Sequence, residues 1–544
     1  FFGRKRKMVP LFQIPQAFSD LETDSSTDEP KFFIQNITKL DLKDASSLQR
    51  VLEGASSKVL RRGSIECFAE NETFSIFYSF VRDFTRLPSQ TQGRLLDTLC
   101  KSVRSASNLF MTGDNEEQDV DIVRTKRNAL KMSTFLLFTV ISSAESAYVA
   151  GKKSEGPKKK GKSKTNDDDD DDIRFDWTSY RENAVSSLAS VLKTDMSKVW
   201  NMGVPDELFI NLFCRTAYQL LEQPINGRGS NEFRNIVLEL IAIPLKLLKS
   251  IETTVVATIL DLLHNSEHCV TNMVHLCKVS SVISGNFGLA KAVLREVVHI
   301  DLSTASARSG AGVKNIATFI SELSDVLPSV VLQNMSVLKP FLDSEPHILR
   351  SCITSVIANV VTHATLEQRK ANTQDCVTET NHDNEEESEG EKEMGSCVHS
   401  KDSFVQTRDT LLDILTERAH DVSSYTRAAV LKAWVVLCEN GALPLLRVQK
   451  AVLLAVDRLK DKAQLVRKAA LQLLTTLLEC NPFMGSLDPS LYEDRAAQVE
   501  LWLQENPLPE DLLEDKKKKT KNNKDDIQEK ENEDDDEDDD ESED

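Results

Sequence analysis

Residues 402–480 contain the same unit twice, and this repetition constrains the fold more than any other feature of the chain. Each copy has an apolar run of helical length, a polar break and a second apolar run. In each copy an aspartate precedes an arginine by six positions, Asp421 with Arg427 and Asp461 with Arg467. The two arginines are 40 residues apart. A period in the 40s with two helices per unit is typical of HEAT and armadillo arrays, so the sequence predicts an all-α solenoid.

The second apolar run of the first copy is apolar on every side of a helix, as Ala433, Val435 and Leu437 show. Such a helix is stable only between neighbours, which a stack of helix pairs supplies. Asp421 and Asp461 stand where a helix N-cap is needed, so we expect them to accept free backbone N–H groups. We interpret the arginines as structural residues of the repeat.

A third, looser copy lies upstream at residues 328–365, with Asp343 and Arg350 in the matching places. Arg350 and Arg427 are 77 positions apart, which is one period of 40 plus 37. The surplus falls in residues 366–401, which are acidic and poor in apolar side chains. Loops of repeat proteins tolerate insertions, so we expect an acidic disordered insertion there.

Changes in composition divide the chain into eight predicted segments. Residues 9–40 carry isolated apolar anchors, which we expect to be docking points of an extended arm: Phe12, Ile14, Phe18, Phe32 and Phe33. Runs of like charge cannot pack and predict disorder. The predicted segments are an extended N-terminal arm at 1–45, a helical region at 46–150, a disordered basic and acidic linker at 151–175, a second helical region at 176–327, a HEAT-like repeat at 328–365, the acidic insertion at 366–401, HEAT repeats with a closing helix at 402–505 and a disordered charged tail at 506–544.

The net charge of −20 is concentrated at one end of the chain. Residues 525–544 hold 15 acidic residues and one lysine, so the preceding 524 residues carry only −6. The ten cysteines form no C-x-x-C motif, which favours reduced thiols in an intracellular protein. No signal peptide is recognisable, and the absence of an initiating Met suggests a fragment. The longest uncharged apolar segment, 132–144, is shorter than the ~20 residues that span a bilayer, so we expect a soluble protein without membrane contact.

Two motifs resemble catalytic or ligand sites. Residues 156–163, GPKKKGKS, match a phosphate-binding loop but lie between lysines and six aspartates, which favours a solvated linker. His264, Glu267 and His268 match the inverted zinc-peptidase pattern, with His275 or Glu296 as a third ligand. Histidines at this spacing also occur by chance in long helical proteins. Residues Cys376, His382, Cys397 and His399 lack zinc-finger spacing. We therefore expect no enzyme activity, no metal and no cofactor.

The last two repeats are basic in an otherwise nearly neutral body. Residues 427–468 contain nine basic and three acidic side chains. Neutralising phosphates with such a stripe releases counterions and would favour DNA binding. The alternative is a solvated outer face of the solenoid, and both interpretations remain open. The candidate DNA contacts are Arg447, Lys450, Arg458, Lys460, Lys462 and Lys468.

Three further runs, 4–7, 152–164 and 516–524, are rich in lysine and suit either nuclear import or self-neutralising spacers. Ser388 and Ser542 lie among acidic residues, so acid-directed phosphorylation is plausible there.

The arm LFQIPQAF, the helical run 74–327, the three repeats and the NPF after the last repeat together resemble the non-SMC HEAT-repeat regulatory subunits of condensin, over most of residues 9–505. This resemblance implies a non-catalytic subunit that binds the kleisin, reaches the SMC ATPases through it, works beside a second HEAT subunit and contacts DNA or chromatin in mitosis. It also implies a nuclear and chromosomal location with a cytoplasmic pool. Family members of this type continue with many more repeats.

The alternative from another class is a general HEAT adaptor of the transport or phosphatase-scaffold type. A metal peptidase built on His264 and His268 is the third hypothesis.

Overall fold

The computed structural model describes residues 11–16, 18–23, 45–61, 65–111, 120–154, 175–200, 203–225, 230–300, 310–379, 395–481 and 490–506. Every regular element in these ranges is a helix, and no strand occurs among them. The chain divides into two units, Phe1–Thr476 and Leu477–Asp544. The predicted all-α class is thereby confirmed.

The first helices of the larger unit include one long helix, α5 (Val120–Ser154), which contacts several of the others. These first helices are α1 (Asp20–Thr23), α2 (Ala45–Arg61), η2 (Ile65–Ala69), α3 (Asn71–Arg82), η3 (Phe84–Arg86), α4 (Ser89–Met111) and α5. Helix α5 contacts α3, α4, α6 (Trp177–Leu192) and α8 (Glu207–Leu221), and α4 and α6 also contact each other. The five helices α3, α4, α5, α6 and α8 thus share one core.

The centre of α5 explains its apolar sequence. Leu130, Leu136, Leu137 and Val140 are each fully buried. The stretch Val120–Gly151 is long and apolar enough to cross a membrane by length and composition alone. In the structure its central side chains are covered by neighbouring helices, as in the core helix of a globular protein. Burial between layers accounts for a helix that is apolar on all sides.

The middle of the unit continues the same helix-on-helix packing. Its elements are α7 (Met196–Val199), α9 (Ser230–Leu247), η4 (Lys249–Ile251), α10 (Glu252–Asn265), η5 (Glu267–Cys269), α11 (Val270–Ser284), α12 (Gly288–Val297) and α14 (Ala311–Val326). Aspartates cap the N-termini of α6, α7 and α8: Asp176 accepts a hydrogen bond from Thr178 N–H at 3.1 Å, Asp195 from Ser197 N–H at 3.0 Å and Asp206 from Leu208 N–H at 3.1 Å. Helices α9, α11, α14 and α17 contact one another in that order, which is the packing of a solenoid.

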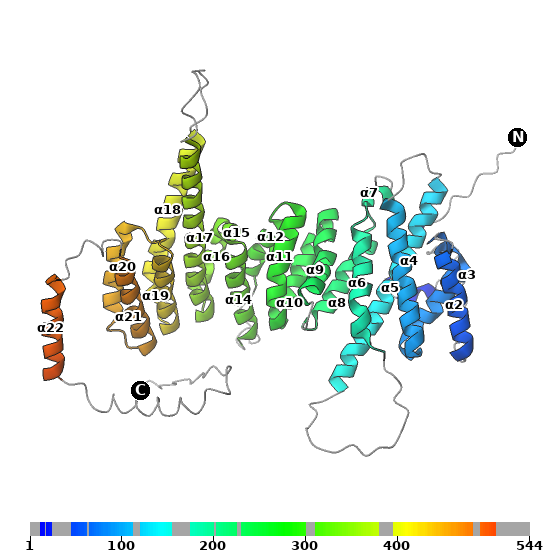
Figure 1. Ribbon diagram of the computed structural model, residues 1–544, viewed down its shortest axis with the longest axis horizontal. Helices are drawn as coiled ribbons and strands as arrows, with labels where there is room; N and C mark the ends of the chain where they lie inside the picture. Colours follow the sequence, from blue (N-terminus) through cyan, green and yellow to red (C-terminus); the bar gives the residue numbers. More distant parts are fainter. Residues whose placement is uncertain are drawn as a thin grey trace, which may run out of the picture. The chain divides into compact units, whose positions relative to one another are not determined.

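The repeats follow as helix pairs. Their elements are α15 (Pro328–Gln333), α16 (Met335–Leu338), η6 (Lys339–Asp343), α17 (His347–Glu379), α18 (Gly395–Arg418), α19 (Ser424–Glu439), α20 (Leu445–Arg458) and α21 (Gln464–Glu479). In the first repeat three short helices replace the single first helix that α18 and α20 provide later. Helices α14, α17 and α19 pack side by side in chain order (Figure 1).

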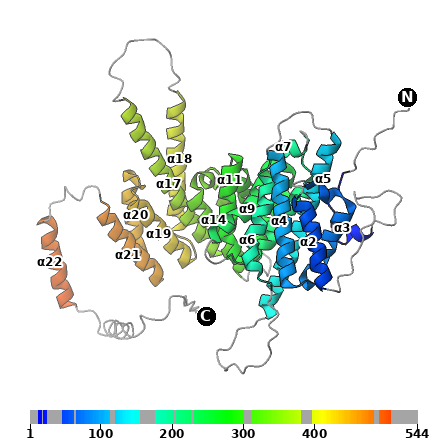
Figure 2. The same cartoon turned by 45° about the vertical axis from the view of Figure 1, so that its right-hand side comes forward.

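The acidic insertion is shorter than the sequence predicts. Helix α17 continues to Glu379 and α18 already begins at Gly395, so only residues 380–394 of the expected disordered range 366–401 lie outside the described residues. The two helices extend beyond their neighbours (Figure 1), and Figure 2 shows them diverging toward the ends that face the insertion. A polar sequence such as TLEQRKANTQ lacks core residues but contains good helix formers, so it continues a helix that packing has already started.

The other predicted boundaries meet the described residues only in part. Helix α5 extends to Ser154, four residues into the expected linker, and residues 155–174 lie outside the described part. In the second unit, α22 (Ser490–Glu505) corresponds to the expected closing helix, and residues 507–544 are outside the described part. The phosphate-loop motif at 156–163 and residues Cys376, His382, Cys397 and His399 carry no described side chains.

Candidate functional site

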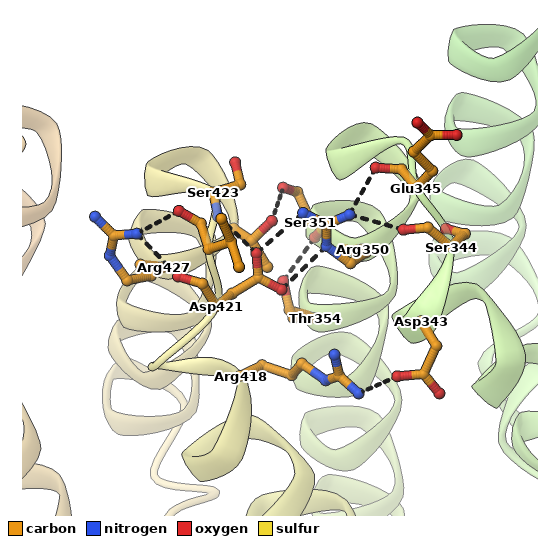
Figure 3. Close-up of polar contacts among 12 residues, drawn as sticks. Asp343, Ser344, Glu345, Arg350, Ser351, Thr354, Arg418, Asp421, Ser423 and Arg427 are labelled. Atoms are coloured by element: carbon orange, nitrogen blue, oxygen red, sulfur yellow. Dashed lines mark hydrogen bonds and ion pairs between the residues drawn. The ribbon is translucent and has the colours of Figure 1, made fainter. Parts of the chain in front are cut away.

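Arg350 at the start of α17 links two consecutive repeats. Its Nη1 donates to the carbonyl oxygens of Ser344 and Glu345, both at 2.7 Å, which holds the loop before α17. Its Nε and Nη2 donate to the two carboxylate oxygens of Asp421 at 3.0 and 3.1 Å (Figure 3). The guanidinium therefore joins its own repeat to the loop of the next one.

Arg427 at the start of α19 repeats this arrangement one repeat later. Its Nη1 donates to the carbonyl oxygens of Asp421 and Val422 at 2.9 and 2.8 Å. Its Nε and Nη2 donate to Asp461 at 2.8 and 2.9 Å. Two parallel bonds from one guanidinium to one carboxylate are strong and specific in direction. We call this series of links the arginine ladder.

Arg467 at the start of α21 has half of the same pattern. Its Nη1 donates to the carbonyl oxygens of Asp461 and Lys462 at 2.8 and 2.6 Å. No carboxylate meets its Nε–Nη2 edge among the residues that the structure describes. Arg350, Arg427 and Arg467 thus hold equivalent positions in three units, and the third lacks the inter-repeat link.

The aspartates of the ladder do not cap their helices in the expected way. Asp421 accepts from the N–H of Ser423 at 2.8 Å, and Asp461 from the N–H of Ala463 at 3.0 Å. Each bond reaches two residues along the chain, which is an Asx turn, and Ser423 is the N-cap residue of α19. The hydrogen bonds from Arg427 hold the pKa of Asp461 below its usual range. The carboxylate is therefore charged and shared between a turn and a guanidinium.

Asp343 is not the equivalent of Asp421, which corrects the alignment expected from the sequence. The carbonyl that Arg350 holds belongs to Ser344, and Ser344 stands six positions before Arg350, as Asp421 stands before Arg427. Asp343 pairs instead with Arg418 of α18 at 2.5 Å and is 73% exposed (Figure 3). The sequence pattern pointed to Asp343 because this aspartate stands one residue before Ser344, which occupies the position equivalent to Asp421.

The six candidate DNA contacts fall into two groups. Arg447 is in an ion pair with Asp413 of α18, and Arg458 contacts Asp457 and Asp461 at 3.4 and 3.5 Å. Both arginines are mostly buried; Arg447 links α20 to α18, and Arg458 pairs within the end of α20 and the loop that follows it. The other four are lysines, all exposed and without an ion pair among the described residues: Lys450, Lys460, Lys462 and Lys468.

The electrostatics near Arg447 reflect its pairing. The hydrogen bond from Arg447 is the main cause that lowers the pKa of Asp413, and the charge of Lys450 adds to it. The same bond raises the pKa of Arg447. A charge held in this way by a neighbouring helix is a structural cation, so the exposed lysines are the stronger candidates for phosphate contact.

The two histidines of the motif, His264 and His268, make packing contacts with neighbouring helices. His264 lies in the last turn of α10 against Gly312 of α14, so close that a Cβ added to the glycine would meet the His264 ring at 2.7 Å. His268 lies 3.1 Å from the carbonyl oxygen of Leu221. No group of three or more potential ligands that could hold a metal ion occurs among the described residues. The two imidazoles therefore serve helix packing in this structure.

Sequence reasoning missed a buried polar cluster between α5 and α6. Glu145 is 1% exposed and accepts hydrogen bonds from Trp177 Nε1 at 2.7 Å and Arg181 Nη2 at 2.9 Å. Arg181 also covers the ring of Phe233, at 4.9 Å from its centroid. The available signal was an acidic residue in the middle of an apolar helix, because a buried carboxylate requires a partner.

A family model covers the region around this cluster. Residues 89–249 match the family described as non-SMC mitotic condensation complex subunit 1, N-terminal region. The match includes α4, α6, α8 and α9 together with Glu145, Trp177 and Arg181.

Several curated proteins are similar over most of the chain. Condensin-1 complex subunit CAP-D2 of Arabidopsis thaliana is 26% identical over 505 residues, which cover 92% of this chain and 33% of that protein. Condensin complex subunit 1 of Xenopus laevis is 27% identical over 479 residues, covering 88% of this chain and 32% of that protein. The protein of the same name from Homo sapiens is 27% identical over 417 residues. These residues cover 76% of this chain and 27% of that protein. The matched part of the chain spans between about a quarter and a third of the length of these relatives.

Among solved structures, Kap121p bound to Nup53p matches 82% of this chain and 43% of its own, at 12% identity and a TM-score of 0.25. A score this low carries no argument about shape or function. The family model and the curated relatives agree with each other and with the resemblance of the sequence. The chain is therefore similar to condensin complex subunit 1 across most of its own length, and residues 89–249 match the N-terminal region of that family.

Proposed function

We propose that this chain is a non-catalytic regulatory subunit of condensin, a HEAT solenoid that binds the kleisin and contacts DNA in mitotic chromosome condensation. The match of residues 89–249 to the condensin subunit family carries this proposal. Because the chain spans about a third of its relatives, the activity and partners of the whole relatives are part of the proposal.

The architecture is consistent with a binding role. A solenoid presents extended surfaces instead of one enclosed pocket, and such surfaces suit long segments of partner proteins. The kleisin is the expected direct partner, the SMC ATPases are reached through it, and a second HEAT subunit works beside it. The expected location is the nucleus and the chromosome, with a cytoplasmic pool.

The proposed DNA contact depends on four exposed lysines, Lys450, Lys460, Lys462 and Lys468. They lie on α20, on the loop after it and on α21, so two consecutive elements contribute positive charge. Lysine side chains bind phosphates as mobile point charges, which gives affinity without base specificity. We propose that this group adds salt-dependent, sequence-independent attachment to DNA.

The assembly proposal is tested by crosslinking the tagged chain in mitotic cells and identifying its partners by mass spectrometry. We expect a kleisin and SMC ATPases, enriched over a tagged HEAT-repeat protein of another class expressed at the same level. Recovery of import receptors or phosphatase subunits without a kleisin would contradict the proposal and favour the general adaptor. Co-expression with the kleisin alone, followed by gel filtration, then tests whether the contact is direct.

A further inference from the structure

Arg467 at the start of α21 has one hydrogen-bonding edge that no described residue fills. Its Nη1 donates to the carbonyl oxygens of Asp461 and Lys462 at 2.8 and 2.6 Å, which fixes the guanidinium against its own loop. The equivalent arginines, Arg350 and Arg427, make the same two kinds of carbonyl contact and place Nε and Nη2 on a carboxylate. The free edge of Arg467 is held in the same way, so the ligand that fits it is a carboxylate.

The side of α21 that carries this edge is open to solvent. Leu471 stands four positions after Arg467, so the two side chains lie on one side of the helix. Leu471 is 58% exposed, whereas Leu431, which follows Arg427 by the same spacing in α19, is fully buried. An incoming segment can therefore reach the Nε–Nη2 edge of Arg467, while the corresponding edge of Arg427 is already covered.

The surroundings of Arg467 are positively charged. Lys462 stands five positions before it and Lys468 directly after it, and both are exposed without an ion pair among the described residues. The one acidic residue between positions 460 and 468 is Asp461, whose side chain is 4% exposed and is held by Arg427. Three cations without a nearby free carboxylate attract acidic segments. We call Lys462, Arg467 and Lys468 the carboxylate site.

The chain itself contains a segment that matches this site in charge. Residues 525–544, called the acidic run here, hold 15 acidic residues and one lysine. They include three consecutive aspartates at 534–536 and three more at 538–540. Carboxylates at successive positions can place one group on the guanidinium and others on the flanking lysines.

The connection between α21 and the acidic run is long enough for the run to reach the site. Asp525 follows Glu479, the last residue of α21, by 46 positions. Helix α22 takes 16 of them and is about 24 Å long. The other residues of the connection, roughly 30, span up to about 100 Å when extended. The carboxylate site lies only about 18 Å back along α21 from Glu479.

We propose that the carboxylate site binds acidic segments, and that the acidic run of this chain occupies it and competes there with DNA. A carboxylate of the run takes the position at Arg467 that Asp461 takes at Arg427. Lys462 and Lys468 are two of the four proposed DNA contacts, so the run and the DNA phosphates exclude each other. The contact of the run stands apart from the proposed function, and only its effect on DNA rests on that function.

The competition has a definite size. A segment tethered to its own site acts at an effective concentration of about 1 mM. With a dissociation constant on the order of 100 µM, the run weakens DNA at this surface by roughly tenfold. Salt screens the run and the DNA alike, so the comparison is made at one ionic strength.

The contact is tested on the full chain with a carbodiimide, which joins a lysine amine to a nearby carboxylate as an amide. In dilute solution we expect peptide mass spectrometry of the monomer band to show Lys462 and Lys468 joined to the acidic run. Lys246 and Lys249, exposed lysines of α9 and η4, are the internal control and should give clearly less product. Arg467→Gln removes the charged fork and should lower the yield at both site lysines by at least about threefold.

The effect on DNA is tested with two matched variants. One changes the six aspartates of residues 534–540 to asparagine, and the other changes the six aspartates of residues 167–172, so that each loses the same charge. We expect the first variant to bind duplex DNA at least about threefold more tightly than the second in anisotropy, because it frees the carboxylate site. Adding Lys462→Ala and Lys468→Ala to both variants should remove this difference. Thermal melting confirms that each variant folds, and where Arg467→Gln melts early the first aspartate variant replaces it in the crosslinking.

Three results would overturn the proposal in separate ways. Equal product at the control lysines and at the carboxylate site would mean that the run meets positive charge anywhere on the chain. Product found only in a dimer band would assign the run to a second copy. Equal DNA affinities of the two aspartate variants would end the competition, and if no form of the chain binds DNA, the proposed DNA contact fails while the crosslinks still decide the contact of the run.

Discussion

Arg427 holds Asp461 through two parallel hydrogen bonds of 2.8 and 2.9 Å, across 34 positions of sequence and from one repeat to the next. The side chain of Asp461 is 4% exposed and that of Arg427 is 15% exposed. The same guanidinium also donates to two carbonyls of its own loop. One residue thus sets both the shape of a loop and the register of two neighbouring repeats.

Replacing Arg427 should destabilise the repeats more than replacing Arg467. Arg427→Ala leaves Asp461 buried with its main partner lost, and breaking a buried pair costs about 3–5 kcal/mol. Arg467→Ala removes only bonds to carbonyl oxygens, for which we expect about 1–2 kcal/mol. Hydrogen exchange of the amides in α19 and α21, read by mass spectrometry, measures each local loss. Equal effects of the two substitutions would contradict the ladder.

Asp421 and Asp343 should differ strongly when each is changed to alanine. Asp421 is 5% exposed and bidentate with Arg350, so Asp421→Ala should cost about 3 kcal/mol or more. Asp343 is 73% exposed, and an exposed ion pair is worth at most about 1 kcal/mol. Thermal melting of both variants at the same pH makes the comparison. A larger effect of Asp343→Ala would restore the alignment that the sequence indicates.

The link to Asp461 should weaken in acid. Its pKa in the folded chain is lowered chiefly by the hydrogen bonds from Arg427, relative to about 3.9 in an unfolded chain. The unfolded state therefore takes up the proton first, so the stabilisation is complete above about pH 4 and is lost as the pH falls through the folded value.

We accordingly expect the difference in melting temperature between the unchanged chain and Asp461→Asn to be larger at pH 6 than at pH 3. Other carboxylates titrate in both proteins and cancel in this difference. A difference that stays constant between the two pH values would mean that Asp461 is not coupled to folding by its charge.

Changing the four exposed lysines to alanine should lower DNA affinity uniformly across sequences. Each lost phosphate contact reduces the slope of log affinity against log salt by about 0.9. Changing Lys450, Lys460, Lys462 and Lys468 together should therefore reduce the slope by up to about 3.6. Fluorescence anisotropy with duplex DNA between about 50 and 200 mM salt measures it.

The matched control for this experiment changes Lys246 and Lys249, two exposed lysines near the end of α9, to alanine. Their loss alters net charge without touching the last repeat. If both variants lose affinity equally per charge removed, binding reflects overall charge and not this surface.

Thiol reactivity should follow burial. Desolvation raises the pKa of Cys214 and of Cys277 to about 12, so at pH 8 only about one molecule in 10⁴ carries a thiolate at either position. Cys480 is exposed. In the native chain iodoacetamide should modify Cys480 and spare Cys214 and Cys277, and in urea it should modify all three. Peptide mass spectrometry reads the result, and native labelling of Cys277 at the rate of Cys480 would contradict the packing of α11.

Much of the fold could be predicted from the chain because a solenoid is encoded locally. The 40-residue spacing of Arg427 and Arg467 and the small and apolar residues of the second helices identify the helix pairs without reference to distant contacts. Short motifs that occur once in the chain predicted its sites less reliably than the repeats predicted its fold. His264 and His268 match a metal motif, yet their positions are taken up by Gly312 and the carbonyl oxygen of Leu221.

By itself, the sequence determined that this chain is a helical repeat protein, that Arg350, Arg427 and Arg467 occupy matching positions, and that the chain resembles condensin subunits. Only the tertiary structure decided that Arg350 holds Asp421 across 71 positions, that Ser344 and not Asp343 is the matching residue, and that Phe12 meets Asn128 across 116 positions. Helical periodicity is a property of neighbouring residues, and these pairings arise only when helices stack. A shift of one residue in a loop changes which carboxylate or amide comes within hydrogen-bond distance, and no local pattern records that choice.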